Sequence, residues 1–126
     1  MGRKHIFIVN GSVDLLNILR ELLQDESYNV TTTNFVPETF DHITALDPNL
    51  IIIDLALRSR AGWDLLERMH GEALTLGIPV IVTSTEPELL ERARSQTSRY
   101  GGQRFIGKPF DIDDVLTAVE ELIGSA

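Results

Sequence analysis

The sequence has 126 residues, of which 43% are hydrophobic and 24% charged, and this composition is typical of one globular domain that buries a core of its own. It contains no cysteine, which excludes disulfides, thiolate catalysis and cysteine-ligated zinc sites. The formal net charge of −8 argues against nucleic-acid binding by this domain, and no apolar run approaches the roughly 18 residues that a membrane span needs.

The N-terminal part of the chain predicts a strand followed by a long helix. Residues 4–9 are mostly apolar and predict a central strand. Ser12 then stands where an N-cap is expected for a helix over 13–25. One side of that helix repeats apolar residues at helical spacing, and we expect the following to face the core: Leu15, Ile18, Leu19, Leu22 and Leu23.

A second strand and helix precede the most apolar stretch of the chain. Residues 29–33 are β-branched and short, which predicts an edge strand. Pro37 suits the first turn of a helix over 37–46, in which we expect three inward side chains: Phe40, Ile43 and Leu46. Residues 50–54 are four branched apolar residues followed by one aspartate. Such an unbroken apolar run is typical of a strand that is covered on both faces of a parallel sheet.

The C-terminal half continues the alternation. A helix over 63–70 is followed by a strand over 78–82, and a polar helix over 86–98, which we expect to be loosely held, comes next. A short strand over 103–107 precedes a last helix that begins near Asp111 or Asp113. Its expected buried face comprises Ile112, Val115, Leu116, Val119, Leu122 and Ile123. Strands and helices thus alternate five times, which predicts a (βα)5 α/β domain with a parallel sheet and helices on both faces.

Several polar residues follow the predicted strands. The carboxyl ends of parallel strands form one edge of the sheet, where ligands bind. Asp54 would stand at that edge, unless it simply begins the next loop, and the same edge would gather Asn10, Gly11, Ser84 and Lys108. A carboxylate can act as a nucleophile toward a phosphoryl group, a lysine can neutralise the transferred charge, and a hydroxyl can bond one of its oxygens.

Together, the order and spacing of these motifs resemble the receiver domain of two-component response regulators. The matching stretches are Ile8-Val9, Ile53-Asp54-Leu55 with Gly62 eight positions after the aspartate, Pro79-Val80-Ile81-Val82 with a hydroxyl residue after it, and Lys108-Pro109-Phe110. The resemblance covers nearly all of the chain and implies that residues 1–126 form a single receiver domain. It also implies a doubly wound, flavodoxin-like three-layer sandwich whose five-stranded sheet has the order 2-1-3-4-5. We therefore expect a cytoplasmic module of phosphorelay signal transduction that is not an enzyme.

The resemblance implies a role for each matching residue at the catalytic edge. Asp54 corresponds to the residue that accepts phosphate from a histidine kinase. Lys108 corresponds to the lysine of the family's pattern, and its bond to Pro109 is expected to be cis.

Two further residues correspond to the switch of the family. Ser84 corresponds to the hydroxyl residue that contacts the phosphoryl group, although Thr83 or Thr85 would take that place if the strand shifted by one residue. Phe105 corresponds to the aromatic residue whose rotamer reports activation.

The chain departs from the family's pattern in the loop after the first strand. Two acidic residues hold Mg²⁺ there in the family, and the corresponding residues here are Asn10 and Gly11. The remaining ligands would be Asp54, the Asn10 side chain and the backbone carbonyl of Ala56. Because each missing charge is worth about 1–4 kcal/mol at roughly 4 Å, we expect Mg²⁺ binding, and phosphotransfer with it, to be weaker by an order of magnitude or more.

The loss of those carboxylates has consequences for the charges that remain. Lys108 is expected to pair directly with Asp54. Asp14 is the only nearby acid that could replace a metal ligand, but its favoured role is an interaction with the N-terminus of the first helix.

Two functions fit these observations. The first is a receiver domain that accepts phosphate on Asp54 from a histidine kinase or phosphotransfer protein and then switches a partner-binding face. The second is an atypical, phosphorylation-independent interaction module that keeps the fold and has lost Mg²⁺-dependent chemistry. In both, the 86–123 face is expected to contact an output domain or a second copy of the chain. A flavodoxin-like cofactor binder is disfavoured, because the loop after the first strand has only one glycine.

Overall fold

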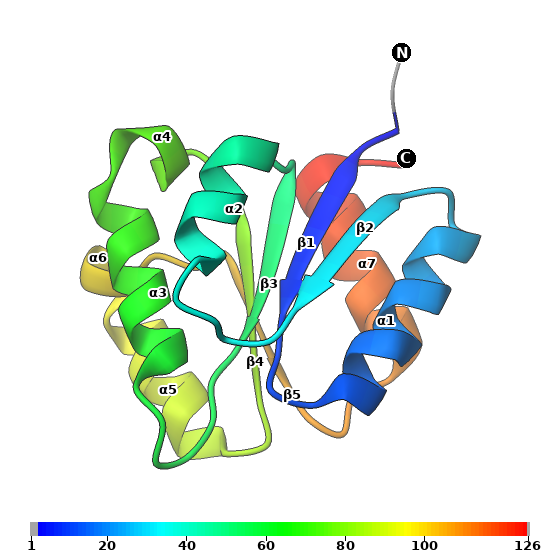
Figure 1. Ribbon diagram of the computed structural model, residues 1–126. Coiled ribbons are helices and arrows are strands. Elements are labelled where there is room, and N and C mark those ends of the chain that lie inside the picture. The colour runs from blue at the N-terminus through cyan, green and yellow to red at the C-terminus, as the bar shows by residue number, and fades with distance from the viewer. Residues whose placement is uncertain (1–2, 126) are drawn as a thin grey trace.

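A computed structural model describes residues 3–125 and shows a five-stranded parallel sheet between two layers of helices (Figure 1). The strands lie in the order β2-β1-β3-β4-β5, which confirms the predicted topology and the edge position of the second strand. The elements, in chain order, are β1 (His5–Val9), α1 (Val13–Asp25), β2 (Asn29–Thr33), α2 (Thr39–Leu46), β3 (Leu50–Asp54), α3 (Ala61–Gly71), α4 (Ala73–Leu76), β4 (Val80–Ser84), α5 (Pro87–Ser95), α6 (Thr97–Tyr100), β5 (Arg104–Gly107) and α7 (Ile112–Ile123).

The sheet separates two hydrophobic cores because successive strand residues point to opposite faces. Helices α1 and α7 cover one face, and α2, α3, α5 and α6 contribute side chains to the other (Figure 1). The central strand β3 is buried along its whole length and feeds both cores, as its unbroken apolar run predicts. Within residues 3–125, no helix is long and apolar enough to cross a membrane.

Three side chains that were expected in the core lie at the surface. Ile18 is 52% exposed, and the helix instead buries Leu16 together with two of the predicted leucines, Leu19 and Leu23. These three leucines share one side of the helix, since their spacing is three and four residues. Leu46 and Ile112 are also exposed, because they are the last residue of α2 and the first residue of α7.

The predicted helix over 86–98 is two helices. The chain leaves helical geometry at Gln96, between α5 and α6, and neither proline nor glycine marks this break in the sequence. The short helix α4 was not predicted, and β4 begins and ends two residues later than expected, so that Ser84 is its last residue. Three apolar residues of α5 are buried in the core: Leu89, Leu90 and Ala93.

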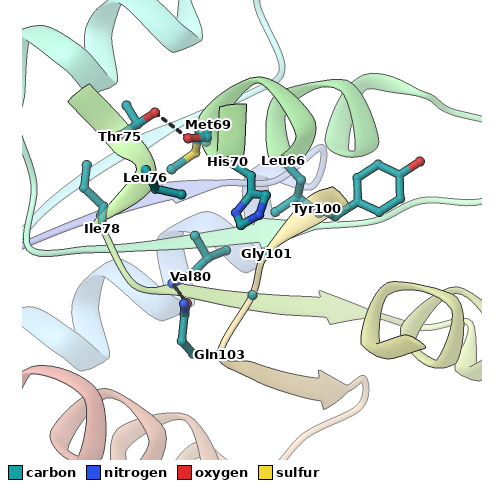
Figure 2. Close-up of a pocket in the computed structure, with 11 residues that line it drawn as sticks. Leu66, Met69, His70, Thr75, Leu76, Ile78, Val80, Tyr100, Gly101 and Gln103 are labelled. Carbon is teal, nitrogen blue, oxygen red and sulfur yellow. Dashed lines mark hydrogen bonds between the residues drawn. The ribbon is translucent and has the colours of Figure 1, made fainter. Parts of the chain in front are cut away.

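The turn between α6 and β5 packs closely against α3. Gly101 has a φ of 71°, and a Cβ at this position would lie 2.9 Å from Nδ1 of His70. Figure 2 shows the His70 ring pointing at this glycine, beside a small cavity, and Gln103 reaching back to β4. The Gln103 side chain accepts a hydrogen bond from the Val80 backbone N–H at 2.6 Å. The cavity measures about 20 Å³, which is room for a single water molecule, so we do not regard it as a ligand site.

His5 gives the fold a pH dependence that can be measured. Its Nε2 lies 2.7 Å from Thr31 Oγ1, and burial lowers the pKa of His5 below its ordinary value of 6.5. The unfolded chain therefore binds a proton more readily, so the stability associated with neutral His5 is fully present above pH 6.5 and is lost as the pH falls below it. We expect His5→Gln to flatten this part of the stability profile in urea denaturation. The exposed His42→Gln serves as the control, and an equal change in both variants would contradict the prediction.

Candidate functional site

The Asp54 carboxylate lies at the carboxyl edge of the sheet and is held through one of its two oxygens. Oδ1 accepts a hydrogen bond from the Thr83 hydroxyl at 2.8 Å and lies 2.8 Å from Lys108 Nζ. Asp54 is 7% exposed, and among residues 3–125 nothing donates a hydrogen bond to its Oδ2. Oδ2 is therefore the oxygen that remains free for chemistry.

Lys108 reaches Asp54 from the loop after β5. Its backbone N–H donates to the Ser84 carbonyl at 2.8 Å, and its peptide bond to Pro109 is cis, as expected. The direct contact of Lys108 with Asp54 agrees with the pairing that the sequence predicts. Both side chains are largely buried, so the attraction between them is screened less than in a surface ion pair.

The sequence predicts one hydroxyl residue at the site, but two adjacent hydroxyl residues, Thr83 and Ser84, lie there with different partners. The Ser84 hydroxyl is fully buried, donates to the Leu55 carbonyl at 2.7 Å and accepts from the Glu86 backbone N–H at 3.1 Å. Thr83 is the residue that contacts the carboxylate, because the parallel register places it directly beside Asp54. Ser84 must therefore exchange its present partner before it can contact a group on Asp54.

The loop after β1 contributes Asn10 and Gly11 to the wall of the site. Asn10 is 3% exposed, and its Oδ1 accepts a hydrogen bond from the Ser12 backbone N–H at 2.9 Å. Ser12 caps α1, as predicted, by accepting from the Leu15 N–H at 3.3 Å. Gly11 has no heavy atom within 4 Å of where a Cβ would lie, so its surroundings are open.

These residues surround a cavity of about 310 Å³, and they do not fit a Mg²⁺ ion. The lining consists of Asn10, Gly11, Ser12, Phe35, Asp54, Ala56, Ser59, Gly62 and Lys108. Its only carboxylate is already paired with an ammonium group, and the Asn10 oxygen is engaged by a backbone donor. Mg²⁺ requires several oxygen ligands and is usually held by one or two carboxylates. Within residues 3–125 no group of three or more metal-binding side chains is present.

Comparison with known proteins identifies the family of the chain. The model of the response regulator receiver domain matches residues 6–120, which is most of the chain. This chain belongs to that family. A receiver domain is a signalling module of two-component systems and not a classical enzyme.

Relatives of known name support the assignment. This receiver domain is 27% identical over 118 residues to the response regulator ArlR of Staphylococcus aureus and 23% identical to the probable transcriptional regulatory protein TcrX of Mycobacterium tuberculosis. Each match covers 94% of this chain but only 52% and 49% of those proteins. The chain therefore spans about half the length of the curated relatives that it matches.

Solved structures share the fold. A CheY-like receiver domain protein from Methanospirillum hungatei is 26% identical, has a TM-score of 0.82 and is matched over 95% of this chain and 93% of that one. The chemotaxis protein CheY4 of Vibrio cholerae has a TM-score of 0.81 at 18% identity, over 96% and 99% of the two chains. The second match shows a common fold only.

Phe105, the expected switch residue of the receiver domain, lies on β5 and packs half-buried against the core beneath α5. The Arg94 guanidinium lies 5.5 Å from the centre of its ring, and Arg92 lies 5.8 Å from the ring of Trp63. Two arginines of the 86–123 face thus lie over aromatic rings, and the Arg94 guanidinium also pairs with Glu91 at 3.5 Å.

Removing the Thr83 hydroxyl is expected to destabilise the receiver domain by about 1–3 kcal/mol, because a hydrogen bond to a buried carboxylate is lost. Thr83→Val keeps the shape of the side chain, and Thr85→Val, at an exposed neighbouring position, is the matched control. Urea denaturation of both variants measures the difference. Equal stabilities would show that the contact with Asp54 contributes nothing.

Proposed function

We propose that this receiver domain accepts a phosphoryl group on Asp54 and responds by changing its 86–123 face. The observation that supports this most directly is the 2.8 Å contact between Lys108 Nζ and Asp54 Oδ1 in a pocket at the carboxyl edge of the sheet. A lysine in this position neutralises charge as a phosphoryl group arrives. The family implies a cognate histidine kinase as the donor, either directly or through a phosphotransfer protein.

The chemistry of transfer follows from which oxygen is free. Oδ2 of Asp54 would attack the phosphorus of a phosphohistidine, forming an acyl phosphate while the P–N bond breaks and its electron pair returns to the imidazole. Lys108 would then contact the new phosphoryl oxygens. Ser84 would leave the Leu55 carbonyl, 2.7 Å away, to donate to the same group. Since the pocket does not fit Mg²⁺, we propose that the metal binds weakly or is dispensable.

The partner surface is also part of this proposal. The 86–123 face would contact either an output domain or a second copy of the chain, and Phe105 would report the change because its ring lies beneath Arg94. A negative net charge of −8 makes nucleic acid an unsuitable partner for this domain itself. We also propose that residues 1–126 form a single receiver domain and that it acts in the cytoplasm, because both properties are expected of the family.

Incubation with acetyl phosphate tests whether Asp54 is the acceptor. We expect intact-protein mass spectrometry to show the addition of one phosphoryl group to the wild-type chain and none to Asp54→Asn. Asp64→Asn, which removes an exposed carboxylate on α3, is the matched control and should still be modified. No addition to the wild type, or an addition that persists in Asp54→Asn, would contradict the proposal.

The second candidate is an interaction module that works without phosphorylation. It is favoured by the absence of carboxylates at positions 10 and 11 and by the hydrogen bond from Ser12 that occupies the Asn10 oxygen. If Asp54 is not modified by acetyl phosphate, this candidate becomes the better one, and Asp54→Asn should then bind the partner as well as the wild type does.

A further inference from the structure

A second cavity, which we call the α2–α3 cavity, lies in the helical layer that contains α2 and α3 (Figure 1). It measures about 320 Å³ and is lined by the loop after β2, by α2 and by α3. Its main apolar side chains are Phe35, Val36, Pro37, Phe40 and Leu65. Sites for small molecules measure about 300–1,000 Å³ and combine a mostly apolar wall with a few polar groups. The α2–α3 cavity therefore has the size and the lining of a small ligand site.

The wall of this cavity is held in place by the protein itself. Thr39 is buried, and its Oγ1 accepts a hydrogen bond from the Val36 backbone N–H at 3.2 Å. The Thr39 backbone N–H donates to the Val36 carbonyl at 3.0 Å, so two bonds fix the start of α2 against the loop. Phe40 and Leu65 belong to the hydrophobic core. Because the wall is already ordered, a ligand would not have to order it on binding.

Arg68 supplies a positive charge at this cavity. Its guanidinium lies 3.9 Å from the centre of the Phe40 ring, and Arg68 makes no ion pair with any residue in the described part of the chain. The carboxylates that precede it on α3 both have arginine partners. Asp64, which also lines the cavity, lies 3.8 Å from Arg60, and Glu67 pairs with an arginine of α6. Arg68 is thus the charge on this part of α3 that lacks a counterion.

We infer that the α2–α3 cavity binds a small molecule that has an aromatic or branched apolar body and one carboxylate. The apolar body would pack against Phe40 and Leu65, and the carboxylate would accept hydrogen bonds from Arg68. A guanidinium that stacks on a ring and presents its planar N–H groups suits a carboxylate well. An uncharged ligand would leave Arg68 without a counterion, and a cation would be repelled by it. The inference goes beyond the proposed function, because this binding does not involve phosphoryl transfer.

Phe35 connects the α2–α3 cavity with the pocket at Asp54, because it lines both of them. Its ring is half-buried and packs against the core. A ligand that contacts Phe35 in one cavity therefore alters the wall of the other. We expect the effect to appear at Ser59, which lines the pocket at Asp54 but not the α2–α3 cavity.

Titration with hydrocinnamate, followed by backbone NMR, tests the inference. We expect saturable shifts of the amides of Val36, Phe40 and Leu65, with a Kd on the order of 1 mM, and a smaller shift at Ser59. Hydrocinnamide has the same shape without the charge and should bind at least about threefold more weakly. Acetate has the charge without the apolar body and should cause no saturable shift.

Replacing Arg68 separates the charge from the apolar wall. Arg68→Gln should weaken the binding of hydrocinnamate at least about threefold and leave that of hydrocinnamide unchanged. Arg92→Gln is the matched control, because Arg92 also lies over an aromatic ring, that of Trp63 at 5.8 Å, and does not line the cavity. Asp54→Asn should still bind hydrocinnamate, so the result is independent of the mass spectrometry experiment.

Four results would overturn the inference. Equal binding of the acid and the amide would remove the role of the carboxylate, and equal losses in Arg68→Gln and Arg92→Gln would remove that of Arg68. Shifts at Val36, Phe40 and Leu65 that follow protein concentration alone would show that a second copy of the chain occupies the cavity. Binding without any shift at Ser59 would overturn the connection through Phe35.

Discussion

Replacing Asn10 and Gly11 together by aspartate is expected to strengthen Mg²⁺ binding by at least about tenfold and to destabilise the metal-free domain. Each new carboxylate lies at the edge that holds Asp54, and a charge pair at roughly 4 Å contributes between about 1 kcal/mol in bulk water and about 4 kcal/mol near a protein surface. Gly11 accepts a side chain without a clash, since nothing lies within 4 Å of its Cβ position, so the variant should fold. Without metal, the carboxylates repel one another and compete for Lys108.

Isothermal titration with Mg²⁺ measures the first effect, and thermal denaturation with and without the metal measures the second. The destabilisation in the absence of Mg²⁺ should disappear at saturating Mg²⁺, because the ion binds only the folded site. The single variant Asn49→Asp controls for added charge away from the pocket. If the double variant binds Mg²⁺ no more tightly than the wild type, the missing carboxylates do not explain the weak metal site.

Substituting Gly62 by alanine is expected to destabilise the domain by about 2–3 kcal/mol, because a packed region would have to move. Gly62 lies in the first turn of α3, directly against the end of β3. A Cβ there would lie 2.7 Å from the Asp54 backbone oxygen and 2.9 Å from Leu55 Cδ2. The clash involves backbone, so rotation of a side chain does not relieve it, and the strand that presents the Asp54 carboxylate has to shift.

Gly71→Ala is the matched control for this substitution. Gly71 lies in the same helix and has no atom within 4 Å of its Cβ position, so alanine there should leave the free energy of unfolding unchanged or raise it by up to about 1 kcal/mol. Urea denaturation compares the two variants with the wild type. A Gly62→Ala variant as stable as Gly71→Ala would contradict the close contact between α3 and β3 that the structure shows.

The layout of the fold follows from features that are visible in the sequence. The apolar run that ends at Asp54 and the alternation of strands with helices depend on local composition, and the structure confirms both. The face of α1 was predicted less well. Its apolar residues stand at six positions over 15–23, and these permit two overlapping stripes, so only packing against the sheet determines that Leu16 is buried and Ile18 is not.

The polar contacts of the site also differ in whether the local sequence predicts them. The Asn10 oxygen bonds a backbone N–H two residues on, which is a local pattern that the sequence Asn-Gly-Ser favours. The bond between Thr83 and Asp54 depends instead on the register of two strands that are distant in the sequence. Sequence reasoning could name Ser84 as the family's hydroxyl residue, but which of the two adjacent hydroxyls touches the carboxylate depends on how β4 lies beside β3.

The most direct test of Asp54 as an acceptor that switches the domain is the binding of beryllofluoride, a mimic of an aspartyl phosphate, followed by backbone NMR. We predict shifts at Asp54, Ser84, Lys108 and Phe105 in the wild type, with and without Mg²⁺, and no such shifts in Asp54→Asn. Shifts at Phe105 would show that the change reaches the 86–123 face. A wild-type spectrum that does not change at these residues when Mg²⁺ is present would contradict the proposal and leave a receiver fold that binds its partner unswitched.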